Sequence, residues 1–276
     1  MMRLPTYATA GQRLAWWAFV GFCGLVFLFL VAPLVAIVPL SFNQGAYLTY
    51  PMTGTSLRWY REFFASSMWQ LSIRNTFIVG TCAALLATTL GTLAALGMAR
   101  ANFPLRGVVM ALVISPMVTP FVITALGMFF FFSQLGLNNS LPGLILAHAA
   151  LGVPFVVITV SATLQGFDTN LPRAAASLGA RPFYAFRRVT LPVIAPGVTV
   201  GALFAFATSF DEVVVTVFLV GPAQRTLPRQ MFSGIRENLD PTIVAAASFM
   251  MLISIFLLVA VELLRRRSER LRGSRA

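Results

Sequence analysis

Two adjacent acidic residues, Asp211 and Glu212, lie deep inside a long apolar run and are the side chains best placed to do chemistry. A charge at the centre of a bilayer costs about 2.5–3.5 kcal/mol even on a lenient insertion scale, so a carboxylate there favours a functional role. Neighbouring residues on a helix point roughly 100° apart, so the two acids are not expected to face one pathway together. Glu212 shares a polar stripe with Thr208 and Thr216, each four residues away, which favours Glu212 as the acid that faces the pathway.

Several roles are open to these acids. They could draw a cationic solute along a transport pathway, or provide the proton or cation site of an ion-coupled secondary transporter. They could instead be buried carboxylates that are satisfied by a hydroxyl, a backbone amide or Arg225. The run that contains them, 193–220, would measure about 40 Å as a straight helix against ~30 Å of hydrocarbon, so it must tilt or break. Ser209–Asp211 is the expected break, and Asp211 could cap a second half-helix there.

The remaining reactive side chains favour no enzyme. His148, the single histidine, lies among alanines, and we expect a hydrogen-bonded helix contact in preference to a proton relay. One histidine makes no metal cluster, and Cys23 and Cys82 follow neither a disulfide nor a metal-binding pattern. All 20 basic residues are arginine, which excludes a Walker A phosphate loop and lysine-based covalent catalysis. We therefore expect no catalytic residue, no metal and no cofactor in this chain.

The elements that must position these residues are membrane-spanning helices. Of the 276 residues, 58% are hydrophobic and 10% are charged, and the mean hydropathy is +0.84, which is typical of a polytopic membrane protein. The sequence predicts an all-α fold in a single domain, 1–276. Six transmembrane helices are expected, at about 15–40, 73–98, 107–132, 142–164, 193–220 and 242–264. The third of these contains Pro116 and Pro120, which could kink it as part of a gate or accommodate a neighbouring helix.

The arginines set the expected topology. An even number of spans puts both termini on one side, and fourteen arginines then share that side while six lie opposite. The fourteen are Arg3, Arg13, Arg100, Arg106, Arg173, Arg181, Arg187, Arg188 and the six arginines between 265 and 275. The positive-inside rule therefore predicts cytoplasmic termini and a cytoplasmic 165–191 segment. The net charge of +12 is expected to serve topology and membrane lipid, and not nucleic acid.

The 165–191 segment, called the polar segment below, is the longest polar interruption between the predicted spans. Pro172 is expected to begin a short helix that continues through Arg173-Ala-Ala-Ala-Ser-Leu178 and ends at a left-handed Gly179. Pro182 can begin a second short helix, Phe183–Val189.

After this second helix, Thr190–Pro192 is expected to turn the chain back into the membrane. Small alanines allow close approach, and Phe183 and Phe186 could anchor in a pocket, so the polar segment suits docking into a groove of another protein. The alternative is an interfacial loop that touches lipid headgroups alone.

Two stretches of the polar segment resemble a known motif. Arg173-Ala-Ala-Ala-Ser-Leu-Gly179, followed after nine residues by Val189-Thr-Leu-Pro192, resembles the E-A-A-x-x-x-G-x(9)-I-x-L-P loop of permease subunits in binding-protein-dependent ABC importers. In that family the loop docks into a cleft of the ATPase. Arg173 replaces the motif glutamate and reverses its charge, so the role of that glutamate is not carried over; Val189 replaces isoleucine conservatively. The resemblance implies ATPase coupling by Arg173, Ala174, Ala175, Leu178, Gly179, Ala180, Phe183, Phe186, Leu191 and Pro192.

Further segments resemble the spermidine/putrescine type of these permeases. They are Ser41-Phe-Asn43, Ser56-Leu-Arg-Trp-Tyr60, Gly166-Phe-Asp168, Ser209-Phe-Asp-Glu-Val-Val214, Gly221-Pro222 and Thr226-Leu-Pro228. The resemblance implies a non-catalytic subunit of the bacterial inner membrane that forms half of a translocation pathway. From the polar stripe described above and the acid next to it, the residues expected to line that pathway are Asp211, Glu212, Thr208 and Thr216. It also implies a second, often different, permease, an ATPase homodimer that binds ATP and Mg²⁺, and an external solute-binding protein. Related permeases handle opines, aminophosphonates and ferric iron, so the family leaves the solute open.

Overall fold

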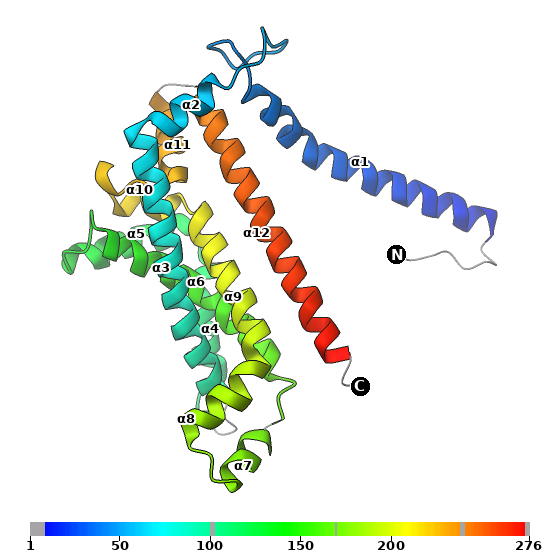
Figure 1. Ribbon diagram of the computed structural model, residues 1–276, viewed down its shortest axis with the longest axis vertical. Helices are drawn as coiled ribbons and strands as arrows, with labels where there is room; N and C mark the ends of the chain where they lie inside the picture. Colours follow the sequence, from blue (N-terminus) through cyan, green and yellow to red (C-terminus); the bar gives the residue numbers. More distant parts are fainter. Residues whose placement is uncertain (1–8, 100–102, 169, 238–240, 274–276) are drawn as a thin grey trace. The chain divides into compact units, whose positions relative to one another are not determined.

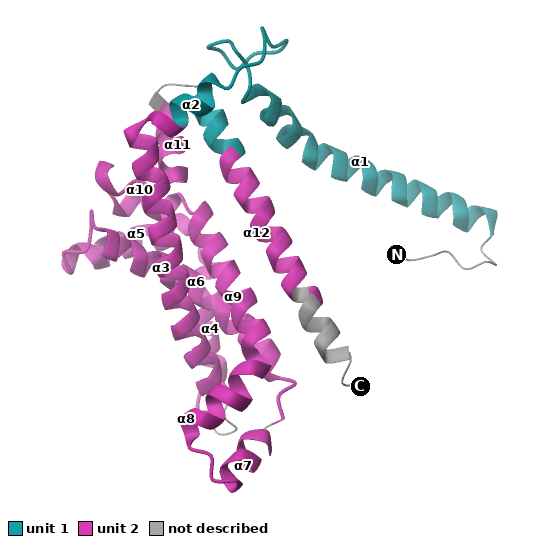
Figure 2. Ribbon diagram, viewed as in Figure 1, with its two compact units in different colours: residues 1–63, 240–248 teal, residues 64–239, 249–276 magenta. Residues whose placement is uncertain are grey.

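The computed structural model describes residues 9–99, 103–168, 170–237 and 241–273 (Figure 1). Regular structure in these residues is helical, apart from one isolated bridge between Asn43 and Thr55. The chain divides into unit 1, residues 1–63 with 240–248, and unit 2, residues 64–239 with 249–276 (Figure 2). Arg3, Arg100 and Arg275, which contribute to the predicted topology, lie outside the described residues.

Unit 1 contains the first apolar helix and the loop that follows it. Helix α1 (Ala10–Leu40) begins at a capping box made by Thr9 and Gln12, and none of its residues is buried in the structure. An apolar helix with an exposed surface all round is suited to lipid or to another apolar partner. The loop folds back on itself, because the indole N–H of Trp59, on α2 (Arg58–Ala65), donates to the carbonyl oxygen of Asn43 over 2.8 Å.

Unit 2 is built around three helices that lie side by side (Figure 1): α3 (Ser67–Met98), α6 (Leu141–Leu164) and α9 (Leu191–Asp211). They approach closely because small residues meet between them. A Cβ atom added to Gly152 on α6 would lie 3.0 Å from Cβ of Ala205 and 3.1 Å from Cβ of Ala87. Small residues of this kind are what lets helices pack where the surrounding lipid provides no hydrophobic driving force.

The third predicted span is a broken pair of helices. α4 (Arg106–Val118) and α5 (Phe121–Gln134) are bent by 106° at Thr119–Pro120, so the proline-rich run does kink. In the described part of the chain, five helices are long and apolar enough to cross a membrane, or six if the bent pair counts as one span.

The fifth predicted span is also interrupted. α9 ends at Asp211, Glu212 and Val213 are not helical, and α10 (Val214–Leu219) follows. The break therefore lies at Glu212–Val213 and not at Ser209–Asp211, because Glu212 leaves α9 to cap the next helix. Beyond α10 the chain forms a 3₁₀ turn (Pro222–Gln224), α11 (Leu227–Glu237) and the last long helix, α12 (Thr242–Gly273).

The segment after α10 is fastened to α3. The side-chain amide of Asn75 donates to the carbonyl oxygens of Ala223 and Arg225, each over 3.1 Å. The backbone N–H of Leu227 donates to the hydroxyl of Thr76 over 2.7 Å. Buried polar side chains on α3 thus satisfy backbone groups that no regular structure pairs.

Candidate functional site

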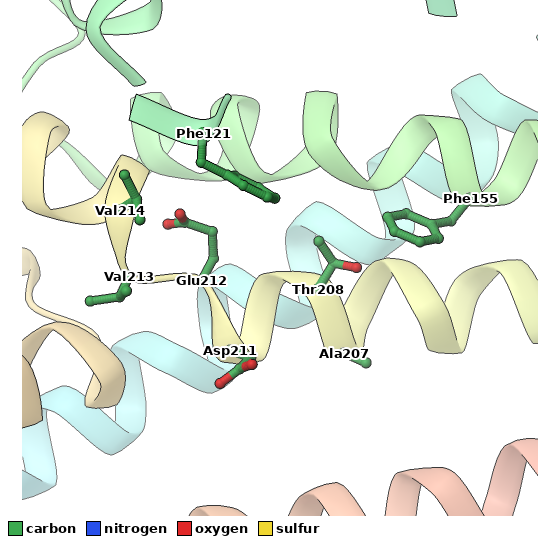
Figure 3. A pocket seen from close by; sticks show the side chains of 8 residues that line it. All are labelled: Phe121, Phe155, Ala207, Thr208, Asp211, Glu212, Val213 and Val214. Carbon is green, nitrogen blue, oxygen red and sulfur yellow. The ribbon is translucent and has the colours of Figure 1, made fainter. Parts of the chain in front are cut away.

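A pocket of about 490 Å³ lies where the two broken helices of unit 2 approach each other (Figure 3). Its lining residues are Phe121, Phe155, Ala207, Thr208, Asp211, Glu212, Val213 and Val214. Phe121 is the first residue of α5, directly after the bend at Pro120, and Glu212–Val213 is the break between α9 and α10. Irregular backbone at membrane depth is tolerated where it is buried in protein or lines a cavity. Here the Glu212–Val213 break lines the cavity, and so does Phe121, the first helical residue after the other break.

Glu212 is a buried cap for the second half of the broken span. Its Oε1 accepts the backbone N–H of Val215 over 2.8 Å, and its Oε2 accepts the backbone N–H of Thr216 over 3.1 Å and the Thr216 hydroxyl over 3.2 Å. The first N–H groups of any helix lack a partner within the helix, and a carboxylate at this position is also attracted by the positive end of the helix dipole. The capping role that the sequence offered to Asp211 is therefore taken by Glu212.

Asp211 has the opposite surroundings. It is the last residue of α9, its side chain is exposed, and it makes no hydrogen bond or ion pair with any described residue. Figure 3 shows the two carboxylates leaving the chain in different directions, Glu212 toward Phe121 and Val214. The polar stripe that favoured Glu212 as the pathway-facing acid does not exist as such, because the helix does not continue from Thr208 to Thr216.

The two threonines of that stripe are separated by the break. Thr208 lines the pocket, whereas Thr216 is fully buried and is bonded to Glu212. A second partner of Thr216 is His148 on α6, whose Nε2 lies 3.1 Å from Thr216 Oγ1. The Nδ1 atom of the same ring lies 2.7 Å from Ser209 Oγ on α9. The hydrogen-bonded helix contact expected for His148 is confirmed.

Sequence reasoning missed five of the eight residues that line the pocket: Phe121, Phe155, Ala207, Val213 and Val214. Phe121 and Phe155 come from other helices, and their Phe-rich neighbourhood gives no signal that separates pocket walls from lipid-facing surface. Val213 and Val214 could have been found, since they directly follow the acids, and Ser209, which was named for the break, also bonds to His148. No group of three or more His, Cys, Asp or Glu side chains in the described ranges could hold a metal ion.

The polar segment provides a second candidate surface. α7 (Asn170–Ser177) begins two residues before Pro172, the predicted start, and the backbone N–H of Asn170 donates to Asp168 Oδ1 over 2.9 Å. The helix ends in a Schellman turn: Gly179 has φ +84°, and the N–H of Ala180 donates to the carbonyl oxygen of Ala175 over 3.0 Å. The left-handed glycine predicted at this position is confirmed.

The second half of the polar segment departs from expectation. α8 (Pro182–Ala185) continues through a π-helical turn, Phe186–Thr190, directly into α9. The turn predicted at Thr190–Pro192 is therefore wrong. Proline lacks the N–H that an uninterrupted α-helix would use, and the wider π-helical turn before Pro192 accommodates that missing bond.

Most of the residues proposed for coupling are exposed. Leu178 is 88% exposed and Phe183 is 74% exposed, whereas Phe186 and Leu191 are half-buried. A hollow of about 470 Å³ beside α7 is lined by Ala175, Leu178, Gly179, Ala180, Arg181 and Tyr184. Arg173, Ala174 and Pro192 are exposed outside it. Four predicted residues thus share one hollow, and Arg181 and Tyr184 are additions that their position after Gly179 could have suggested.

Comparison with known proteins places this geometry in a family. The family model for the binding-protein-dependent transport system inner membrane component matches residues 87–270. The spermidine/putrescine transport system permease protein PotC of Escherichia coli K12 is 28% identical over 246 residues, which cover 89% of this chain and 93% of the relative. The putrescine transport system permease protein PotI of the same strain is 33% identical over 234 residues, covering 82% and 83%.

The fold is also known from solved structures. A chain of a bacterial ABC transporter involved in the import of the acidic polysaccharide alginate matches with a TM-score of 0.71 at 15% identity, covering 95% of this chain and 99% of that one. The predicted all-α, ABC-permease fold is confirmed, and the family supports an importer permease over an ion-coupled secondary transporter. The chain belongs to the inner membrane components of binding-protein-dependent transport systems, the permease subunits of ABC importers.

Proposed function

We propose that this chain forms half of the translocation pathway for a small cationic solute, such as a polyamine, and that Asp211 is the acid that attracts it. The observation that carries the proposal is the pocket at the two helix breaks: the exposed Asp211 carboxylate, which has no partner among the described residues, lines it together with Thr208 and with Glu212, the cap of α10.

The chemistry of the pocket suits an organic cation. An ammonium group ~4 Å from a carboxylate gains about 4 kcal/mol at an effective dielectric constant of ~20, which offsets part of the cost of dehydrating the cation. Phe121 and Phe155 contribute ring faces that can also attract a cation. Glu212 would add negative potential while its own oxygens stay occupied by the N-terminus of α10.

The names of the relatives support the same class of solute. PotC and PotI are named as permeases for spermidine/putrescine and for putrescine, which are polyamines. The structural relative from the alginate transporter handles an acidic polysaccharide, so the fold alone does not choose the charge of the solute. The acidic pocket of this chain is what favours a cation.

The polar segment is proposed to couple the pathway to ATP hydrolysis. Exposed apolar side chains at Leu178 and Phe183, beside a hollow, are suited to a cleft in a partner ATPase homodimer that binds ATP and Mg²⁺. In this proposal the chain is itself non-catalytic and carries no cofactor. It lies in a bacterial inner membrane with both termini in the cytoplasm, paired with a second, homologous permease, and receives solute from an external solute-binding protein.

Asp211→Asn, the amide variant of the exposed acid, tests the pathway role. The assembled transporter is reconstituted with its solute-binding protein, and uptake of radiolabelled spermidine, uptake of radiolabelled putrescine and basal ATP hydrolysis are measured in parallel. Asp211→Asn should abolish most uptake while ATP hydrolysis and subunit assembly continue. If Asp211→Asn transports spermidine like the wild type, Asp211 is not the attracting acid. If neither spermidine nor putrescine is taken up by the wild type, the proposed solute class is wrong.

A further inference from the structure

The two halves of the broken span are not joined by backbone hydrogen bonding alone. At Glu212–Val213 the regular helical ladder stops, so side chains must hold α9 and α10 in register. Glu212 belongs to the break itself and bonds to α10 alone. His148, which is 1% exposed, comes from α6 and contacts Ser209 on α9 and Thr216 on α10 with the two nitrogens of one ring.

The donors and acceptors of this cluster can be matched in a single direction. The Thr216 hydroxyl donates to Glu212 Oε2 over 3.2 Å and keeps lone pairs with which to accept. His148 Nε2–H can then donate to Thr216 Oγ1, while an unprotonated Nδ1 accepts the hydroxyl hydrogen of Ser209. A neutral imidazole in this tautomer uses each hydrogen once. His148 Nε2 and Glu212 Oε2 are 3.6 Å apart, farther than the threonine hydroxyl that lies between them in this chain of bonds.

We propose that His148 is a positioning residue: it braces α9 against α10 across the break and so fixes the direction in which Asp211 enters the pocket. The importance of the direction of Asp211 rests on the proposed function, whereas the hydrogen bonds of His148 across the helix break do not depend on it. A brace needs one acceptor and one donor at a set spacing, and does not need a proton to move. Glutamine can supply both groups without titrating, so it separates a brace from a proton relay.

The test uses a reporter of the break that does not depend on solute. The parent for the test is the assembled transporter in which Cys23→Ser and Cys82→Ser remove the native thiols of this chain. The added substitution Val213→Cys then places one thiol in the two-residue break, where it lines the pocket. The rate of its modification by a cationic methanethiosulfonate reagent is measured together with Vmax and KM for spermidine uptake. His148→Ala should change the modification rate at least roughly fivefold and lower Vmax, because Ser209 and Thr216 lose a buried partner. His148→Gln should stay within about twofold of the parent, because both bonds can re-form.

A control variant and two substitute variants accompany His148→Ala. Thr88→Ala removes a hydroxyl that bonds within its own helix, to the carbonyl oxygen of Ala84, and should leave the reporter unchanged. If His148→Ala does not assemble, Ser209→Ala and Thr216→Val each remove one side of the brace and should shift the reporter in its place. An unchanged rate in these variants overturns the proposal. So does His148→Gln losing uptake with an unshifted reporter, since that pattern requires proton transfer. If the variants shift the reporter as expected but the wild type takes up no spermidine, the proposed solute is wrong and the brace stands.

Discussion

The helix break at Glu212–Val213 and the polar segment are both irregular parts of unit 2, but the first buries bonded polar side chains and the second exposes apolar side chains. At the break, Glu212, Thr216, Ser209 and His148 satisfy one another inside the chain and are buried. In the polar segment, apolar side chains such as Leu178 are exposed.

This difference separates side chains whose interactions are satisfied within the chain from side chains that a partner protein would cover. A buried, mutually bonded cluster should respond to mutation through the stability and geometry of this chain. A surface that exposes large apolar side chains should respond through binding, because those side chains gain a dry environment when a partner covers them. Three substitutions test this division.

The largest effect is expected at the cap. Glu212→Ala leaves the backbone N–H groups of Val215 and Thr216 without a partner. Each such buried group costs about 1–3 kcal/mol of folding free energy. Part of this loss is offset, because the variant no longer has to bury a carboxylate. We expect a net loss of about 2 kcal/mol. The midpoint of thermal unfolding of the purified chain in detergent should fall, whereas Asp211→Ala should leave it nearly unchanged. Equal midpoints for the two variants would show that the cap does not stabilise the break.

The need for that cap could be predicted from the sequence better than the residue that provides it. The length of the apolar run required a tilt or a break near Ser209–Asp211, and two acids stood there to satisfy a new helix N-terminus. Which acid does so depends on where α9 stops, and near its end α9 contacts α6, which lies far away in the sequence. His148 and Ser209 lie 61 positions apart, so no local pattern pairs them.

The first half of the polar segment was easier to predict, because its signals are local. Gly179 ends α7 in a left-handed conformation, as the pattern of small residues and glycine predicts. The second half was harder, since a proline that usually marks a boundary is accommodated at Pro192 by a π-helical turn. The walls of the pocket were missed for a similar reason: Phe121 lines it because α4 and α5 bend by 106°, an angle that the two prolines permit but do not specify.

A smaller effect, and one confined to binding, is expected at Leu178. Leu178→Ala removes a side chain that is 88% exposed, so the unfolding midpoint of the chain alone should not change. Covering a leucine is worth about 1.5–3 kcal/mol, so affinity for the partner ATPase should fall roughly tenfold or more. Leu85→Ala, on the spanning helix α3 and 63% exposed, is the matched control and should keep full affinity. Affinity that is equal in both variants would remove Leu178 from the interface.

The smallest effect is expected at Arg173, and it shows what a reversed charge means. Arg173 is exposed on α7, and its guanidinium has no ion-pair partner among the described residues, so its charge is available to a partner. An exposed ion pair contributes about 0.2–1 kcal/mol. Arg173→Ala should therefore weaken ATPase binding only about two- to fivefold at low salt, and the difference should shrink at high salt, where such pairs are screened. Arg173→Glu, which restores the charge of the family motif, should weaken binding further, because an ATPase surface matched to arginine is acidic. Tighter binding by Arg173→Glu would mean instead that the ATPase keeps the basic surface suited to the motif glutamate, and that this chain tolerates a mismatch which its exposed apolar side chains outweigh.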